Sequence, residues 1–221
     1  MKITEDIYQV GGAGFTSPED AAIYLISMDG HHALVDAGCG RMLERLFQNM
    51  AACGVYPRDL EYLLITHCHY DHTGGARAVK ERTACRVVAH EKDAVFLEKG
   101  DSRVTAASWY GERLEPFRVD WKLSSPRVNI PLGGQTIEAI HMPGHSPGSL
   151  VYLTRSQGQK VVFAQDVHGP LNESLLSNRQ DYLHSLGMLL DLDTDILCEG
   201  HYGVIEGKKK IRAFIRSFMR T

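Results

Sequence analysis

The sequence predicts an α/β fold in which two β-sheets pack face to face and helices cover their outer sides. Strand-like segments form two blocks, one before residue 100 and one after Pro126, with helix-like segments between the strands. Several of these strands end at residues that commonly bind metals, near positions 67–72, 145, 166 and 201. Strands and amphipathic helices must each bury a face, and packed layers of sheet and helix allow this.

The first block begins with two alternating strands within 21–37, joined at Asp29-Gly30, which is a strong hairpin signal. Residues 41–52 predict a helix, because Leu43, Leu46, Phe47 and Met50 recur at helical spacing before Gly54. A strand at 61–66, a helix at 75–82 and a strand at 85–89 follow. This block therefore reads as one sheet with helices between its later strands.

The second block contains strands at 135–141, 149–154 and 161–164, with a turn at 156–159. A helix around 178–190 and a strand at 195–198 come next. Residues 208–221 predict an amphipathic helix whose apolar stripe is Ile211, Phe214, Ile215 and Phe218, and its basic residues read as a solvated face. We expect one domain over residues 1–221, with pseudo-repeated halves.

Residues 100–125 do not fit either block. They contain Trp109, Tyr110, Phe117 and Trp121, so both tryptophans of the chain lie here. The segment is either a lid or pocket wall beside the active edge, or a stretch whose aromatic side chains anchor it onto the core. Both interpretations stay open from the sequence.

Composition limits the class of protein. A formal charge of −3 with 23% charged residues gives no general attraction to nucleic acid. The chain has neither a membrane-spanning apolar run nor an N-terminal signal-peptide core, and its five cysteines form no C-x-x-C pair. We therefore expect a cytoplasmic protein with reduced thiols that acts on a small molecule, without a nucleic-acid or membrane partner; a homodimer is compatible with the sequence.

The segment from Thr66 to Gly75 carries three histidines and one aspartate in six positions, 67–72. Histidine and aspartate are usual ligands of zinc and related metals. On an extended chain residues 67, 69 and 71 point the same way. His72 joins them only where the backbone turns, and Gly74-Gly75 would allow such a turn.

Further residues of the same type follow three later strands. His145 lies in a turn-rich corner, Asp166 follows a short apolar strand, and His201 follows Ile196-Leu197-Cys198. The candidate metal ligands are thus His67, His69, Asp71, His72, His145, Asp166 and His201. Five histidines and two aspartates suffice for two metal ions with open positions for water.

The remaining histidines have simpler explanations. His31 and His32 flank the hairpin turn and read as surface residues, while His90 opens a helix and His184 lies within one. His141 and His168 are open: either could hydrogen-bond to a ligand or contact substrate. Cys68 alternates with the ligands, so we expect its side chain to point away from them.

The motif His67-x-His69-x-Asp71-His72, followed by His145, Asp166 and His201, resembles that of the metallo-β-lactamase-fold hydrolases over nearly the whole chain. Asp36, in Leu34-Val35-Asp36-Ala37-Gly38, matches a motif that precedes this cluster. The resemblance implies a four-layer αβ/βα sandwich of two mixed sheets flanked by helices. It also implies His67, His69 and His145 around a first metal, Asp71, His72 and His201 around a second, Asp166 as the bridge, and Asp36 behind the ligands.

The glyoxalase II-like thioesterases and lactonases are the branch most similar to this motif. That resemblance implies two divalent metal ions, Zn(II) first with Fe or Mn as alternatives, and a metal-bridging hydroxide that cleaves a small thioester or lactone. Asp71 would position the nucleophile and pass its proton onward. Glyoxalase II has an additional C-terminal helical region, whereas only about twenty residues follow His201 here. Aspartate at 166, where many zinc β-lactamases carry cysteine, argues against a periplasmic β-lactamase.

Two other functions fit the same residues. A mononuclear Fe(II) enzyme of the persulfide dioxygenase type would use His67, His145 and Asp166 on one iron. A ligand-binding or sensor protein would keep the metals and show little turnover. The motif alone does not separate these functions from a hydrolase.

Overall fold

The first sheet has six strands in the order β1-β2-β3-β4-β5-β6. The computed structural model describes residues 1–164 and 166–220. The strands are β1 (Ile7–Gly11), β2 (Ile23–Met28), β3 (His31–Val35), β4 (Leu60–Leu64), β5 (Arg86–His90) and β6 (Trp121–Leu123). β1 to β3 pair antiparallel and β3 to β6 pair parallel. The predicted hairpin is confirmed as β2 and β3.

The second sheet also has six strands, in the order β12-β11-β10-β9-β8-β7. They are β7 (Arg127–Leu132), β8 (Gln135–His141), β9 (Leu150–Ser156), β10 (Gln159–Phe163), β11 (Ile196–Glu199) and β12 (Gly203–Glu206). Only β10 and β11 pair parallel, and the other neighbours are antiparallel. Both sheets are therefore mixed, as predicted.

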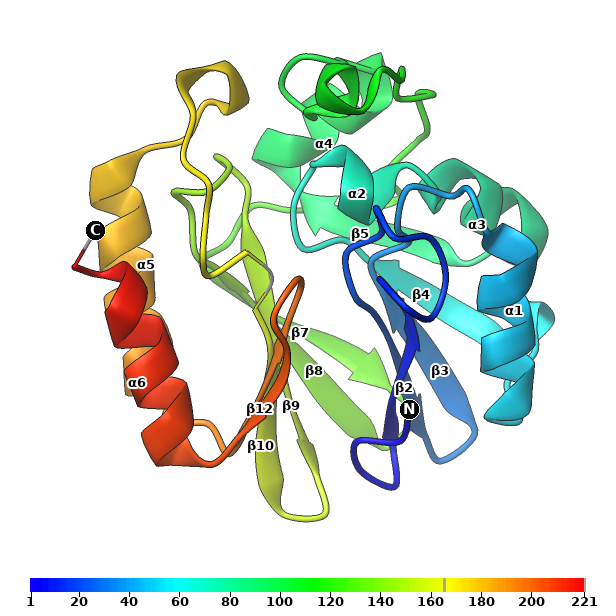
Figure 1. The fold of residues 1–221 in the computed structure, drawn as a ribbon. Helices are drawn as coiled ribbons and strands as arrows, with labels where there is room; N and C mark the ends of the chain where they lie inside the picture. The colour runs from blue at the N-terminus through cyan, green and yellow to red at the C-terminus, as the bar shows by residue number, and fades with distance from the viewer. Residues whose placement is uncertain (165, 221) are drawn as a thin grey trace.

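Helices cover the outer side of each sheet. The first sheet carries α1 (Leu43–Ala52), α3 (Ala76–Thr83) and α4 (Glu91–Lys99), and the second carries α5 (Arg179–Asp191) and α6 (Lys208–Phe218). Figure 1 shows the two sheets in the middle of the molecule, with α5 and α6 on one side and α1 and α3 on the other. The predicted four-layer sandwich is confirmed.

Three apolar cores hold these four layers together. The first joins α1, α3 and α4 to the first sheet, the second fills the space between the sheets, and the third joins α5 and α6 to the second sheet. β4 serves two cores, because Leu63 points to the helices and Leu64 to the other sheet. Strands buried on both faces are apolar throughout, which explains why β4 could be recognised from its sequence.

The two sheets are joined by hydrogen bonds where β4 ends. The backbone N–H of Leu150 donates to the carbonyl of Thr66 at 2.7 Å. The hydroxyl of Tyr152 donates to the carbonyl of Ile65, also at 2.7 Å. Because Ile65 and Thr66 lead directly into the histidine cluster, these bonds fix that cluster relative to the second sheet.

The segment 100–125 is anchored to the first sheet. Phe117 is buried in the outer core and Trp121 opens the edge strand β6. Trp109 is 53% exposed, and the ring of Tyr110 lies 5.5 Å from that of Tyr70, at the start of the short helix α2 (Tyr70–Thr73). The anchoring interpretation therefore applies to Phe117 and Trp121, while Tyr110 borders the turn that contains the candidate ligands Asp71 and His72.

The predicted C-terminal amphipathic helix is α6, whose Ile211 and Ile215 are buried against the second sheet. Within the part of the chain that the structure describes, every helix is too short or too polar to cross a bilayer.

Candidate metal centre

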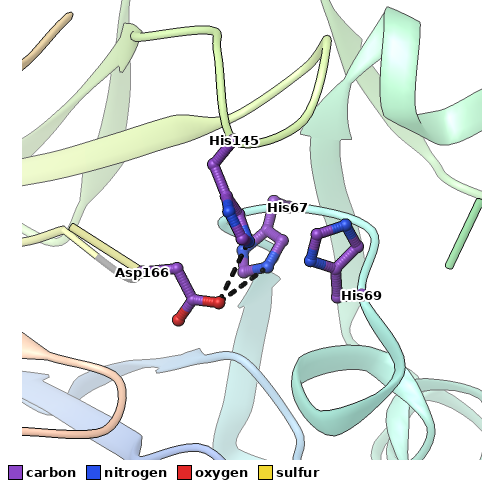
Figure 2. Close-up of side chains that lie close together, drawn as sticks. All are labelled: His67, His69, His145 and Asp166. Carbon is purple, nitrogen blue, oxygen red and sulfur yellow. Dashed lines mark ion pairs between the residues drawn. The ribbon is translucent and has the colours of Figure 1, made fainter. Parts of the chain in front are cut away.

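Four of the predicted ligands form one group at the edge where the two sheets meet. His67 and His69 follow β4, His145 lies in the loop between β8 and β9, and Asp166 comes after β10. Their ligand atoms all lie within 4.8 Å of one another. Figure 2 shows the three imidazoles and the carboxylate pointing toward a common centre. The Asp166 Oδ2 atom lies 3.0 Å from His145 Nε2 and 3.5 Å from His67 Nε2.

The other three predicted ligands form a second group beside the first. The Asp71 Oδ2 atom lies 3.2 Å from His201 Nε2 and 3.6 Å from His72 Nε2. The Asp166 Oδ1 atom lies 3.2 Å from the Nε2 atoms of both histidines. Asp166 thus presents one oxygen to each group, and the structure brings all seven predicted residues together.

The turn that gathers the first ligands differs from the sequence prediction. Extended alternation ends at His69, because α2 starts at Tyr70 and directs Asp71 and His72 through one helical turn. Gly74 and Gly75 are not left-handed, having φ of −55° and −82°. Gly75 is required for close packing instead, since a Cβ there would lie 2.4 Å from the carbonyl oxygen of Ala37.

Outer partners hold the imidazoles of the candidate ligands in one orientation. Asp36 is fully buried, has a left-handed φ of 62°, and accepts hydrogen bonds from the Thr66 N–H at 2.8 Å and the Thr66 hydroxyl at 2.7 Å. Its other contact is His72 Nδ1 at 2.7 Å. The Nδ1 atom of His145 likewise lies 3.0 Å from the carbonyl oxygen of Pro170. Fixing Nδ1 leaves Nε2 free to face a metal.

Five buried atoms of the cluster have no hydrogen-bond partner among the described residues. They are the Nε2 atoms of His67, His69, His72 and His145, and Oδ1 of Asp166. Buried polar atoms are normally hydrogen-bonded, so this concentration of exceptions needs an explanation. Two divalent cations bound by imidazole nitrogen and carboxylate oxygen would satisfy all five.

The electrostatics of the two groups differ. Burial and the neighbouring imidazoles lower the pKa of His67 far below its usual range and that of His69 to about 3, so both rings are neutral at pH 7 with a lone pair available. Burial acts the same way on His72 and His201, but nearby carboxylates outweigh it and raise the pKa of both, that of His201 to about 10. Burial would raise the pKa of Asp166, yet the surrounding histidines hold it well below its usual value.

Several residues outside the candidate ligands had been assigned a place or a role from the sequence, and the structure shows where each of them lies. His32 is buried, not a surface residue, because β3 lies between two layers. Cys68 lies in the apolar core behind the first sheet and so points away from the ligands, as predicted. His168 contacts the buried Glu199 through Nδ1 at 2.9 Å, with its ring 5.0 Å from that of His201. His141 stacks on His90 with ring centroids 3.8 Å apart.

The sequence did not single out two buried acidic residues that lie near the cluster. Glu199 accepts hydrogen bonds from the backbone N–H groups of His201 and Tyr202 at 2.7 and 2.8 Å. Asp93, on α4, accepts from Cys68 and from the loop that carries His145. Glu199 could have been found as an acid ending an apolar strand just before a ligand. Asp93 has no such local signal.

Residues 17–201 match the family model of the metallo-β-lactamase superfamily. The chain is 30% identical over 227 residues to an acyl-coenzyme A thioesterase, MBLAC2, of Gallus gallus, covering 90% of this chain and 78% of that protein. It is 29% identical over 196 residues to the hydroxyacylglutathione hydrolase GloC of Haemophilus influenzae, covering 84% and 87%. A class B3 di-zinc metallo-β-lactamase, LRA-12, from an Alaskan soil metagenome superposes with a TM-score of 0.78 at 26% identity, covering 91% and 77%. The chain belongs to the metallo-β-lactamase superfamily.

Proposed function

We propose that this protein is a dinuclear metal-dependent hydrolase that cleaves a small thioester or lactone. The observation that carries the proposal is the orientation of Asp166. Its Oδ2 atom faces His67 and His145, and its Oδ1 atom faces His72 and His201. A carboxylate with one oxygen directed at each of two ligand groups has the arrangement that bridging two cations requires.

Divalent cations bound there, with Zn(II) expected, would supply a water of lowered pKa and polarise the substrate carbonyl. The side chains of the protein position the reacting groups for this chemistry. The surrounding histidines and its bond to His201 lower the pKa of Asp71 despite burial, so its carboxylate is ionised at neutral pH. In that state Asp71 can accept a hydrogen bond from the attacking water and receive its proton.

The substrate class rests on two relatives. One is named an acyl-coenzyme A thioesterase and the other a hydroxyacylglutathione hydrolase. Both names describe hydrolysis of an acyl group carried on a thiol. A thioester is therefore the first substrate class to test, and a lactone, which presents the same kind of carbonyl, is the second.

The runner-up is a mononuclear Fe(II) oxidoreductase of the persulfide dioxygenase type, because His67, His145 and Asp166 alone form a two-histidine, one-carboxylate set. The second group, Asp71, His72 and His201, supports the dinuclear hydrolase. On a single iron those three side chains would have no metal to bind, and His72 Nε2 would remain buried without a hydrogen bond among the described residues.

Metal stoichiometry of protein purified without oxygen tests the proposal, together with a panel of acyl-coenzyme A, hydroxyacylglutathione, lactone and persulfide substrates. We expect two divalent ions per chain and turnover of a thioester or lactone. His145→Ala should remove most of the turnover, whereas His184→Ala, a control at an exposed position on α5, should leave it unchanged. One iron per chain with oxygen consumption on the persulfide would overturn the hydrolase. Two ions without turnover of any substrate would favour a sensor.

A further inference from the structure

Asp93 is a buried carboxylate that none of the proposed chemistry uses. It lies in the first turn of α4 and is 1% exposed. Its Oδ2 atom accepts hydrogen bonds from the backbone N–H of Cys68 at 2.9 Å and from the hydroxyl of Ser146 at 2.6 Å. Its Oδ1 atom accepts from the backbone N–H of Gly148 at 2.7 Å.

The donors to Asp93 belong to the two loops that carry the three histidines of the first group. Cys68 lies between His67 and His69, at the end of β4 in the first sheet. Ser146 and Gly148 follow His145, in the loop between β8 and β9 of the second sheet. One side chain thus ties together two loops that belong to different sheets.

The packing at Gly148 independently supports the connection that Asp93 makes between the two loops. Its φ is not left-handed, so its backbone conformation does not require glycine. A Cβ at this position would instead lie 2.6 Å from Asp93 Oδ1 and 2.7 Å from the Asp93 backbone nitrogen. The absence of a side chain at Gly148 therefore allows the loop to approach Asp93 closely enough for its N–H to bond.

Two further contacts also connect the start of α4 to the loop that carries His145. His90 directly precedes α4 and stacks on His141, with the two ring planes 12° apart. His141 Nε2 in turn lies 3.0 Å from the carbonyl oxygen of Pro147, in the His145 loop. A buried carboxylate costs free energy unless its hydrogen bonds are satisfied. Among the described residues, the hydrogen bonds that the Asp93 carboxylate accepts come from the His67–His69 loop and the His145 loop, and they hold these two loops in place.

We propose that Asp93 is a positioning residue that sets the distance between His145 and the pair His67 and His69, and so controls the affinity of the first metal position. This inference rests on the proposed metal centre. The second group is held by other contacts: Asp36 bonds His72, and Glu199 bonds the backbone of His201. Loss of Asp93 should therefore weaken one metal position selectively.

The test is the stepwise affinity for Zn(II) of the full-length metal-free protein, measured by competition with a chelator. Asp93→Asn replaces one acceptor oxygen with an amide that faces N–H and O–H donors. We expect about a 10- to 100-fold loss of affinity for one ion and little change for the other, the size typical when a support of a metal ligand is removed. In a His145→Ala background Asp93→Asn should have no further effect, because the first position is already lost.

Asp20→Asn is the matched control, since Asp20 is also buried and accepts from the backbone N–H groups of Cys39 and Ser17, and among the described residues no hydrogen bond or ion pair joins its side chain to a predicted ligand. If Asp93→Asn does not fold, Ser146→Ala removes the hydroxyl bond to Asp93 and should weaken the same ion to a smaller degree. Equal weakening of both ions, or unchanged affinities, would overturn the proposal. If the wild-type protein binds one ion only, the dinuclear function fails, but the affinity of that ion still tests Asp93.

Discussion

Replacing Asp36 by asparagine should weaken the second metal position more than the first. Asp36 Oδ1 accepts from the N–H of Thr66, and Oδ2 lies 2.7 Å from both the Thr66 hydroxyl and His72 Nδ1. With its carbonyl oxygen kept on Thr66 N–H, asparagine turns an amide N–H toward His72. The Nδ1 atom must then accept, which places the ring proton on Nε2, the atom that faces Asp71 and Asp166.

The size of the effect follows from this change of tautomer. A histidine protonated on Nε2 cannot donate a lone pair to a metal, so binding must first reverse the tautomer and break the new bond. Outer partners of ligating histidines contribute about 10- to 100-fold in metal affinity, which corresponds to about 1.4–2.8 kcal/mol. The first position should lose less affinity, because Asp36 reaches it only indirectly, through the Thr66 hydroxyl that lies 3.1 Å from His67 Nδ1.

Competition between the metal-free protein and a chelator of known affinity measures the affinities for the first and the second metal ion in one titration. Asp20→Asn serves again as a control for the loss of a buried, hydrogen-bonded acid. Compared with Asp93→Asn, the experiment shows whether each variant weakens a different ion the most. The reasoning would be refuted by an Asp36→Asn protein that binds both ions as tightly as the wild type, or that loses affinity for both equally.

Three further predictions follow from the same contacts. His145→Ala should lose the first ion and most activity, and retention of full metal content by elemental analysis would show that the ligand set is wrong. Asp166→Ala should disturb both ions, so that loss of one ion with the other unperturbed would reject bridging. Burial lowers the pKa of His90 to about 4; because the unfolded chain takes up that proton near pH 6.5, the folded state should lose on the order of 2 kcal/mol from this residue between pH 7 and pH 5. In His90→Phe, urea unfolding of the metal-free protein should show a smaller difference in stability between these two pH values, and an unchanged difference would contradict the assignment.

Much of the fold could be predicted because its central strands and helices carry their signal locally. The apolar run of β4 and the helical spacing in α1 are properties of a few consecutive residues, and both elements are confirmed within two residues or so at their ends. Edge strands lack such a signal. β7 alternates between exposed and buried residues and contains Pro131, and β6 is only three residues long, so neither was predicted.

The candidate site also contains some residues that the sequence reveals and others that it does not. The histidines and the aspartate within residues 67–72 could be recognised as candidate ligands because they cluster in sequence, and the short helix α2 changed only how Asp71 and His72 reach the centre. Asp93 could not be recognised, because its partners Cys68, Ser146 and Gly148 lie 25 to 55 residues away along the chain. A carboxylate on an amphipathic helix reads as solvated unless the tertiary structure shows what covers it.

The sequence by itself determined which side chains can bind metal and the strand ends on which they lie, because ligand chemistry belongs to the residue and apolar strands are encoded locally. The division of the seven candidate ligands into two groups was implied by the family resemblance and not by the residues alone, and only the tertiary structure decided which Asp166 oxygen faces each group. It also decided which buried acids hold them, with Asp36 behind His72 and Asp93 between the loops of His69 and His145. The physical reason is that four loops from two sheets converge at one edge, and their relative positions depend on how the sheets pack.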